Sequence, residues 1–169
     1  LLSLDVTHKL NIGENHSLLS GVDYSRESAH ATGHTGGFDE GFPKTSQYFS
    51  GIYTNYAAKN RLFSFTLGSR LQFFEKDTGV DSLFLHQFSL FREIPVARVN
   101  AKFTSKTGYK SPSLYQRLSS SYGNPNLSNE FSESVEFALS KQFKRFYVAA
   151  TYFNSDVTDK IDWSGKYAN

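Results

Sequence analysis

The sequence contains no cysteine and no methionine, and none of its apolar runs is long. Without cysteine there is no disulfide framework and no metal site built on thiolates. No run approaches the roughly 18 apolar residues that a membrane-spanning helix needs. The 169 residues carry a formal net charge of +2, with no basic run, so nothing indicates a nucleic-acid surface. We therefore expect neither a disulfide-stapled domain nor a nucleic-acid partner.

Aromatic residues are abundant, with 16 phenylalanines and ten tyrosines, although the mean hydropathy is only −0.44. A chain that is polar on average and rich in β-forming residues is typical of a transmembrane barrel, because lipid-facing and lumen-facing side chains alternate along each strand. A soluble β-sandwich has the same average composition. Composition alone therefore leaves these two fold classes open.

The segment 62–75 shows the clearest pattern in the chain, an alternation of apolar and polar side chains. Strands in soluble sheets typically span about five or six residues, whereas a strand tilted across a bilayer needs about 9–11. The length of this alternation favours a membrane-spanning strand. Its apolar face carries Phe63, Phe65, Leu67, Leu71 and Phe73, and its polar face carries Ser64, Thr66, Gly68, Arg70 and Gln72.

Seven further segments are predicted to be strands. Weaker alternation occupies 2–10, 98–104 and 134–140, and the pattern does not assign the faces of 17–27, 46–58, 83–91 and 145–157. Glycine and β-branched or aromatic residues interrupt every candidate helical pattern, so no helix is indicated. The chain is expected to be all-β, with about eight strands and no helix longer than one or two turns.

The predicted connections have two lengths that alternate along the chain. Short ones are expected at 11–15, 58–61, 93–96 and 142–144, and long ones at 27–45, 76–82 and 107–129. Up-and-down membrane barrels alternate in this way, with short periplasmic turns and longer outer loops. Greek-key sandwiches have no reason to do so. The sequence therefore predicts an antiparallel up-and-down transmembrane β-barrel segment, with 1–169 as a single unit.

The long connection predicted at 27–45 contains residues that suggest a metal site. His30 and His34 are spaced to chelate a metal from one face of a helix, but three glycines at 33, 36 and 37 argue against a helix there. Asp39 and Glu40 are adjacent and lack the spaced acidic pattern of calcium loops. We therefore expect a flexible, solvated outer loop and no metal site.

No sequence motif indicates catalysis. The chain has neither a nucleophile elbow nor a phosphate-binding glycine loop, and its serines have no base at motif spacing. We expect no enzyme activity and no cofactor. Four charged residues predicted to face the lumen are Arg70, Arg98, Lys102 and Glu136. They either line a transport path or pair with a plug or with neighbouring strands, and the sequence does not choose between these roles.

Two proline-containing motifs are the most informative feature of the chain. Residues 109–116 read Tyr-Lys-Ser-Pro-Ser-Leu-Tyr-Gln, and residues 122–127 read Tyr-Gly-Asn-Pro-Asn-Leu, followed by Glu130 and Ser132. The pair resembles motifs in the barrel of TonB-dependent outer-membrane receptors, and 122–127 is closer to the cobalamin receptor of that family than to most siderophore receptors. The stretch 152–162 resembles a strand-end motif of the same barrels. The resemblance extends over about 105–163.

Backbone chemistry gives these motifs a physical role. Pro112 and Pro125 fix φ and push the preceding residue into an extended conformation, which stiffens the chain beside them. Gly123 and Asn124 are expected to permit a left-handed turn before Pro125.

The resemblance implies a plugged barrel of about 22 strands in the bacterial outer membrane, which imports a scarce nutrient with force transmitted from the inner membrane. The chain starts at Leu1 and shows no signal peptide and no plug domain. We expect an internal fragment of such a barrel, whose partners are outer-membrane lipid, a small-molecule nutrient and, through a missing N-terminal segment, TonB. The alternative is a complete small barrel of about eight strands with a structural or adhesion role.

The same resemblance suggests a ligand class. Haem receptors of the family place a histidine between the two motifs, but 113–123 contains none, so haem iron would lack its axial ligand. This favours a cobalamin-like ligand, with a siderophore as the second choice.

The candidate ligand-binding residues are Tyr109, Tyr115, Tyr122 and Asn124. Tyrosines offer large amphipathic surfaces to a flat or macrocyclic ligand. The alternative, which we favour for the tyrosines, is that they form an aromatic girdle or pack the loop on itself.

A piece of a larger barrel has two unpaired edge strands and one apolar face. Free edges present unsatisfied N–H and C=O groups to other chains, and the apolar stripe at 63–73 exceeds what monomers usually leave uncovered. We expect that the isolated chain does not remain a lone open sheet in water. It closes on itself, as about eight strands can, or is covered by a second chain or by detergent.

Overall fold

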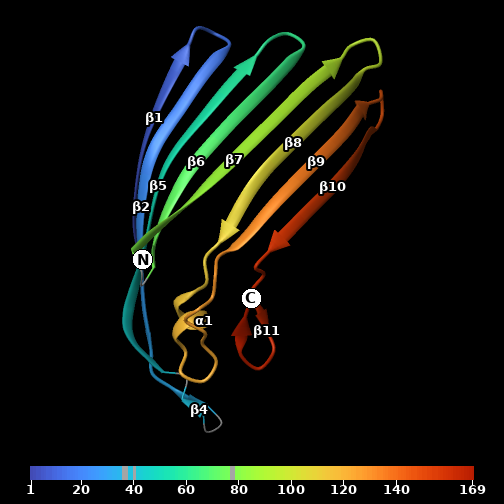
Figure 1. Ribbon diagram of the computed structural model, residues 1–169. Coiled ribbons are helices and arrows are strands. Elements are labelled where there is room, and N and C mark those ends of the chain that lie inside the picture. Colours follow the sequence, from blue (N-terminus) through green and yellow to red (C-terminus); the bar gives the residue numbers. More distant parts are fainter. Residues whose placement is uncertain (36–37, 40, 77–78) are drawn as a thin grey trace.

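The computed structural model describes residues 1–35, 38–39, 41–76 and 79–169, and most of them form one curved antiparallel sheet (Figure 1). Two small hairpins and the short helix α1 (Leu114–Leu118) lie at one end of it. The hairpins are β3 (His34–Thr35) with β4 (Phe38–Asp39), and β11 (Asp162–Trp163) with β12 (Tyr167–Ala168). In pairing order, the eight strands of the sheet are β1 (Leu2–Ile12), β2 (His16–Ala31), β5 (Phe42–Lys59), β6 (Phe63–Lys76), β7 (Gly79–Ile94), β8 (Val99–Lys110), β9 (Glu130–Gln142) and β10 (Tyr147–Thr158).

This architecture confirms the predicted all-β, antiparallel up-and-down segment. Each strand of the sheet pairs with the next one along the chain, the small hairpins aside. Within the described residues β1 and β10 do not pair with each other, so the sheet is open. The alternative of a closed small barrel is therefore not what the structure shows. No helix in the described part of the chain has the length and apolar character needed to cross a membrane.

One face of the sheet, here called the outer face, is apolar across the strands as well as along them. Side chains on five neighbouring strands stand in register there: Val6, Val22, Ile52, Leu71 and Phe84. All five are exposed, Ile52 to 56%. Water rarely covers a contiguous apolar surface of this kind on a soluble monomer, whereas the hydrocarbon of a bilayer solvates it. The outer face therefore has the character of a lipid-facing surface.

The opposite face, here called the inner face, is polar over β1, β2, β5 and β6. The row next to the apolar one consists of Asp5, Asp23, Gly51 and Gln72, again in register. Gln72 is only 1% exposed, and its Nε2 donates to the Ser50 carbonyl at 2.9 Å. The period-two pattern predicted for 62–75 thus extends over several strands, and it separates an apolar face from a polar one.

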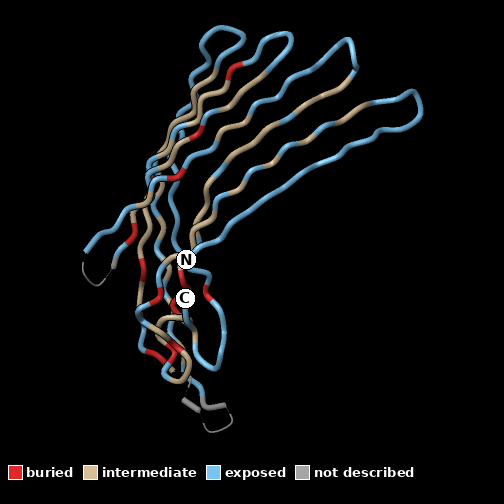
Figure 2. Tube along the Cα trace, turned by 45° about the vertical axis from the view of Figure 1, so that its right-hand side comes forward, coloured by how far each residue is buried: buried red, intermediate tan, exposed pale blue. Residues whose placement is uncertain are grey.

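Buried residues are few and gather mainly where the loops meet at one end of the sheet (Figure 2). Leu114, Leu127 and Ile161 are the buried aliphatic side chains of that end, and Leu114 is only 2% exposed. A single sheet has no second layer to cover its faces. The loops therefore supply the packing that the isolated sheet lacks.

One predicted connection is wrong. β6 reaches Lys76 and β7 begins at Gly79, and these two residues are partners in the ladder. The predicted long loop at 76–82 is therefore mostly strand, with residues 77–78 outside the described residues, and the strict alternation of short and long connections fails here. The polar sequence resembles a loop, but backbone pairing continues through it because the ladder does not depend on apolar side chains.

Because the edges of the sheet are open, the association of the isolated chain with other copies can be tested. In buffer without detergent, the chain should sediment as a dimer or larger species, because pairing satisfies the edge groups of β1 and β10 and covers the outer face. Analytical ultracentrifugation gives the mass. A monodisperse open monomer with free edges would contradict the prediction.

The assignment of the outer face to lipid predicts opposite outcomes at two adjacent residues. Leu67→Arg places a charge near the middle of β6 on the outer face and should lower the free energy of unfolding in liposomes by about 2–4 kcal/mol. Thr66→Arg, on the inner face of the same strand, is the matched control and should cost far less. Urea unfolding of the two variants of the full-length protein measures this, and equal losses would refute the assignment of faces.

Candidate ligand-binding site

The candidate site lies at the end of the sheet opposite the turns that join β1 to β2, β5 to β6, β7 to β8 and β9 to β10, where three segments that are distant in sequence meet (Figure 1). They are the connection between β2 and β5, the loop 111–129, and the segment 159–169. The Ser120 hydroxyl donates to the Gly41 carbonyl and so joins the first two. The side-chain amide of Asn124 donates to the Tyr167 carbonyl at 3.0 Å and joins the last two.

The loop 111–129 is organised by α1, for which the sequence analysis found no signal. Ser113 caps the helix: its hydroxyl accepts from the Gln116 N–H at 3.2 Å, and Gln116 Oε1 accepts from the Ser113 N–H at 2.9 Å. This reciprocal pair is a capping box, which the Ser-x-x-Gln spacing encodes. The five residues of α1 agree with the predicted limit of one or two turns. The position of this helix was not predicted, because its capping box was not recognised in the sequence.

Gly123 is needed for a reason other than the predicted left-handed turn. Neither Gly123 nor Asn124 has a positive φ. A Cβ on Gly123 would instead lie 2.5 Å from the carbonyl oxygen and 2.6 Å from the amide nitrogen of Ser119. The Gly123 N–H donates to that same carbonyl at 2.8 Å. The chain after α1 therefore folds back onto the end of the helix, and glycine allows the approach.

Three aromatic rings meet one another at the loop end of the sheet. The rings of Tyr122 and Trp163 meet edge to face with centroids 5.1 Å apart, and those of Trp163 and Tyr167 meet in the same way at 4.9 Å. Edge-to-face pairs at these distances are favourable. Trp163 nevertheless remains 48% exposed. The cluster thus holds a rigid aromatic surface open at the loop end of the sheet.

Tyr115 and Asn124 each contact Tyr167 of this cluster and fix the loop. The Tyr115 ring packs edge-on against Phe42, with centroids 6.5 Å apart, and against Tyr167 at 6.4 Å. Asn124 Oδ1 accepts from the Asn126 N–H at 3.0 Å, while its amide nitrogen is bonded to the Tyr167 carbonyl. These contacts are those of the loop-packing role that the sequence analysis favoured for the tyrosines.

Asn169 fastens the segment 159–169 to the loop. Its Oδ1 accepts from the Ser128 N–H at 3.2 Å, and its Nδ2 donates to the carbonyls of Ser128 at 3.0 Å and Asp159 at 2.8 Å. One amide side chain therefore bonds both backbone groups of Ser128, as a neighbouring strand would.

The structure brings Tyr115, Tyr122 and Asn124 together but places Tyr109 apart from them. The Tyr109 ring stacks on Phe74, with centroids 6.4 Å apart. It lines a hollow of the inner face together with Asp23 and Arg70. Tyr109 therefore belongs to the wall of the sheet, and the other three belong to the loops.

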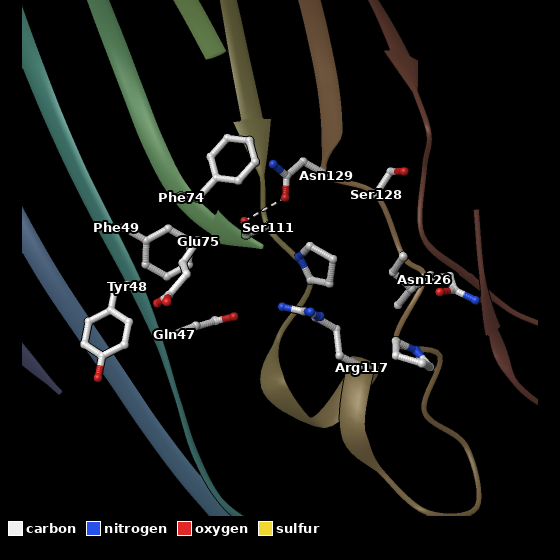
Figure 3. A pocket seen from close by; sticks show the side chains of 13 residues that line it. Gln47, Tyr48, Phe49, Phe74, Glu75, Ser111, Arg117, Asn126, Ser128 and Asn129 are labelled. Atoms are coloured by element: carbon white, nitrogen blue, oxygen red, sulfur yellow. Dashed lines mark hydrogen bonds between the residues drawn. The ribbon is translucent and has the colours of Figure 1, made fainter. Parts of the chain in front are cut away.

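A cavity of about 240 Å³ lies between the loop and the ends of β5 and β6 (Figure 3). Phe49 and Phe74 line it from the strands, and Pro112 and Arg117 line it from the loop. Across its rim, Ser111 donates to Asn129 Oδ1 at 2.8 Å. Pockets for drug-sized ligands span about 300–1,000 Å³, so this cavity has room for part of a large ligand.

Three of the four charged residues predicted for the inner face pair with residues on other strands of the sheet. Arg70 Nη2 lies 2.7 Å from Asp23 Oδ1, and Lys102 Nζ lies 3.3 Å from Glu136 Oε1. Arg98 is different, because it lies in the turn between β7 and β8 with a φ of 51°. The expectation that Arg98 begins a strand and faces the lumen was therefore wrong. A left-handed residue closes this turn and keeps its side chain out of the strand pattern.

Most of the possible metal ligands lie outside what the structure describes, namely Glu40 and the side chains of His34 and Asp39. His30 is described and is part of β2, which extends to Ala31. Among the described residues no group of three histidine, cysteine, aspartate or glutamate side chains is placed to hold a metal ion.

Phe42, Trp163, Tyr167 and Asn169 also belong to the site and were not predicted. The contacts that tie them to the loop 111–129 join residues 40 or more positions apart, as between Tyr122 and Trp163, so no local pattern reveals them. One signal was present, since Trp163 is the single tryptophan of the chain and follows directly on the strand-end motif at 152–162.

The whole chain, residues 1–169, matches the family model described as TonB dependent receptor-like, beta-barrel. The chain therefore belongs to the TonB-dependent receptor family, as the motifs at 109–132 suggested, and these 169 residues are part of its barrel. No curated protein matches the sequence.

The solved structure of a protein named "Copper transporter OprC" has the same fold. It superposes on 94% of the chain with a TM-score of 0.75 and 13% sequence identity. The chain spans 29% of the length of that structure. A likeness at this low identity concerns the fold alone, so the copper transport in that name belongs to OprC and does not extend to the cargo of this chain.

The close approach at Gly123 predicts that Gly123→Ala loosens the loop. The added methyl group meets backbone atoms that cannot move aside, so the loop should lose about 1–3 kcal/mol of local stability. Hydrogen exchange of the amides at 111–129 in the full-length protein measures the loss. Gly33→Ala is the matched control in a neighbouring segment, because a Cβ there meets nothing within 4 Å. Equal protection in the two variants would contradict the assignment.

Proposed function

We propose that this chain is a wall segment of an outer-membrane TonB-dependent transporter, and that its loop end faces the outside of the cell. The observation that carries the proposal is the exposed apolar row of Val6, Val22, Ile52, Leu71 and Phe84 on one face of the sheet, while the opposite face of the same strands is mostly polar. The partners are outer-membrane lipid, a small-molecule nutrient and TonB, which another part of the parent protein engages. The segment has no enzymatic role in this proposal.

The loop end supplies a surface for the nutrient. Tyr122 and Trp163 present aromatic surface there, while Tyr115 and Asn124 hold the loop in place. A rigid aromatic surface binds a flat or macrocyclic ligand with little loss of conformational entropy. Tyr109 takes part from the inner face, where it lines a hollow beside Arg70.

A cobalamin is the nutrient that we propose, with a ferric siderophore as the alternative. Support comes from the resemblance of 122–127 to the cobalamin receptor of the family and from the absence of histidine at 113–123, which disfavours haem. Copper has no comparable support in this chain, which lacks the cysteine and methionine that soft copper sites use.

Uptake by cells that express the full-length protein tests the proposal. Labelled cyanocobalamin should accumulate in a TonB-dependent manner, whereas a ferric siderophore, haemin and copper should not. Accumulation of one of the other cargoes would replace the cobalamin assignment and leave the transporter assignment intact. TonB-independent accumulation of all of them would refute the transporter itself.

Equilibrium binding of cyanocobalamin to the purified full-length protein tests the aromatic surface. Trp163→Ala should weaken binding about ten- to hundredfold, because burying an aromatic side chain against a ligand is worth about 1.5–3 kcal/mol. Trp163→Phe should retain most of the affinity. Phe146→Ala removes another exposed aromatic ring, in the turn before β10, and is the control. Equal affinities for all three variants would exclude the cluster as the binding surface.

A further inference from the structure

Two glycines on the inner face lie beneath long side chains of the adjacent strand. In register across the sheet, Thr7, Gly21 and Tyr53 form one row, and Asp23 and Gly51 belong to the next. Glycine weakens a strand because it has no side chain to pack and loses more conformational entropy on folding. A glycine inside a strand therefore calls for a local reason, and both positions have one.

Tyr53 crosses Gly21 to reach the edge strand β1. Its hydroxyl lies 2.7 Å from Thr7 Oγ1 and donates to the Asp5 carboxylate, with both oxygens at 3.1 Å. A Cβ on Gly21 would meet the end of the Tyr53 ring and would lie 2.7 Å from the Val6 carbonyl oxygen. Tyr53 of β5 thus bonds β1 by passing over β2, and the bare backbone of Gly21 makes room for the ring.

Arg70 crosses Gly51 in the same way. From β6 it passes over β5 to pair with Asp23 of β2 at 2.7 Å, while its Nε donates to Gln72 Oε1 at 2.7 Å. A Cβ on Gly51 would meet the guanidinium and would lie 2.9 Å from Asp23 Oδ2. The Arg70 guanidinium also lies over the Tyr53 ring, 5.7 Å from its centroid, so the two crossings touch. Together they brace the four strands β1, β2, β5 and β6.

The flattened Arg70 lies between two hollows of the inner face, each of about 310 Å³. Asn55, Gly68 and Gln87 help to line the first, and Phe49 and Tyr109 help to line the second. Arg70 is part of the lining of both. If its guanidinium stood away from the sheet, it would project into the space that both hollows open to.

We propose that Gly21 and Gly51 are positioning residues, which lay Tyr53 and Arg70 flat so that four strands are braced without side chains standing into the space beside the inner wall. The geometry of the brace does not depend on the cargo. Only the consequence for uptake rests on the proposed function.

Gly68 offers a matched control for both positions. It lies in β6 on the same inner face, but a Cβ there meets nothing closer than 3.5 Å, the Asn55 Nδ2. Gly68→Ala therefore adds a methyl group at ordinary contact distance and should leave stability unchanged or raise it. Any change of stability that Gly68→Ala shows is the general effect of replacing glycine by alanine in these strands, without a clash.

The experiment compares Gly21→Ala, Gly51→Ala and Gly68→Ala in the full-length protein, by urea unfolding in liposomes. Gly21→Ala and Gly51→Ala should lower the unfolding midpoint, and Gly68→Ala should not. Arg70→Ser should bring the Gly51→Ala protein most of the way to the midpoint of Arg70→Ser alone, because the nearest atoms to the added methyl group belong to Arg70 and the Asp23 carboxylate is free to turn once Arg70 is shortened. Tyr53→Ser should restore Gly21→Ala only in part, since the Val6 carbonyl stays in place.

The second measurement compares the rate of cargo uptake with the affinity for cargo at the loop end. Gly51→Ala should slow uptake several-fold with unchanged binding at the loop end, and Arg70→Ser in the same protein should restore the rate. Should Gly51→Ala fail to insert, its recovery by Arg70→Ser alone still supports the proposal. The proposal is overturned if Gly51→Ala behaves like Gly68→Ala, or if shortening Arg70 brings no recovery. If no cargo is taken up, the unfolding series alone decides it.

Discussion

The rest of the structure depends on the continuous backbone ladder that runs from β1 to β10. Inside a bilayer no water is available to bond a free N–H or C=O, so a chain that spans it as strands must pair each one along its whole length. The pairing fixes the register, and the register decides which side chains share a face. A slip of β6 by one residue would turn Leu71 to the polar face and Gln72 to the apolar face. The apolar outer face and the polar inner face are therefore two consequences of a single register.

Outside the ladder, the loop end solves a different problem. The loop 111–129 has no strand partner, so its backbone groups are bonded by the capping box of α1, by the return of the chain at Gly123 and by the Asn169 amide. Aromatic edges then join it to Phe42 and to the β11–β12 hairpin. Binding residues are often carried by loops that a rigid scaffold positions. In this chain the loop is itself rigidified, which leaves Trp163 exposed and yet fixed in place.

On the inner face, polar side chains reach past their nearest neighbours. Arg70 and Tyr53 each bond a residue two strands away, so they connect strands that share no backbone hydrogen bond. Such cross-links matter most at the edge strand β1, which among the described residues has a backbone partner on one side only. The glycines beneath them lower local strand propensity, and the bonds that they permit offset that loss.

Local sequence determined the all-β class, the number of strands in the sheet and the membership of the family, because period-two alternation and short motifs act over a few residues. It also contained the Ser113–Gln116 capping signal, although the helix was not recognised from it. Tertiary structure alone decided that β6 extends to Lys76 and β7 begins at Gly79, and that Arg98 lies in a turn and not in a strand. It also decided that Asp23 pairs with Arg70, and that Trp163 and Tyr167 pack with the predicted tyrosines. The physical reason differs between them. The contacts of Asp23 and Trp163 depend on strand register and on segments that return from tens of residues away. The ends of β6 and β7 and the turn at Arg98 depend on backbone pairing and on a left-handed φ, which side-chain periodicity does not report.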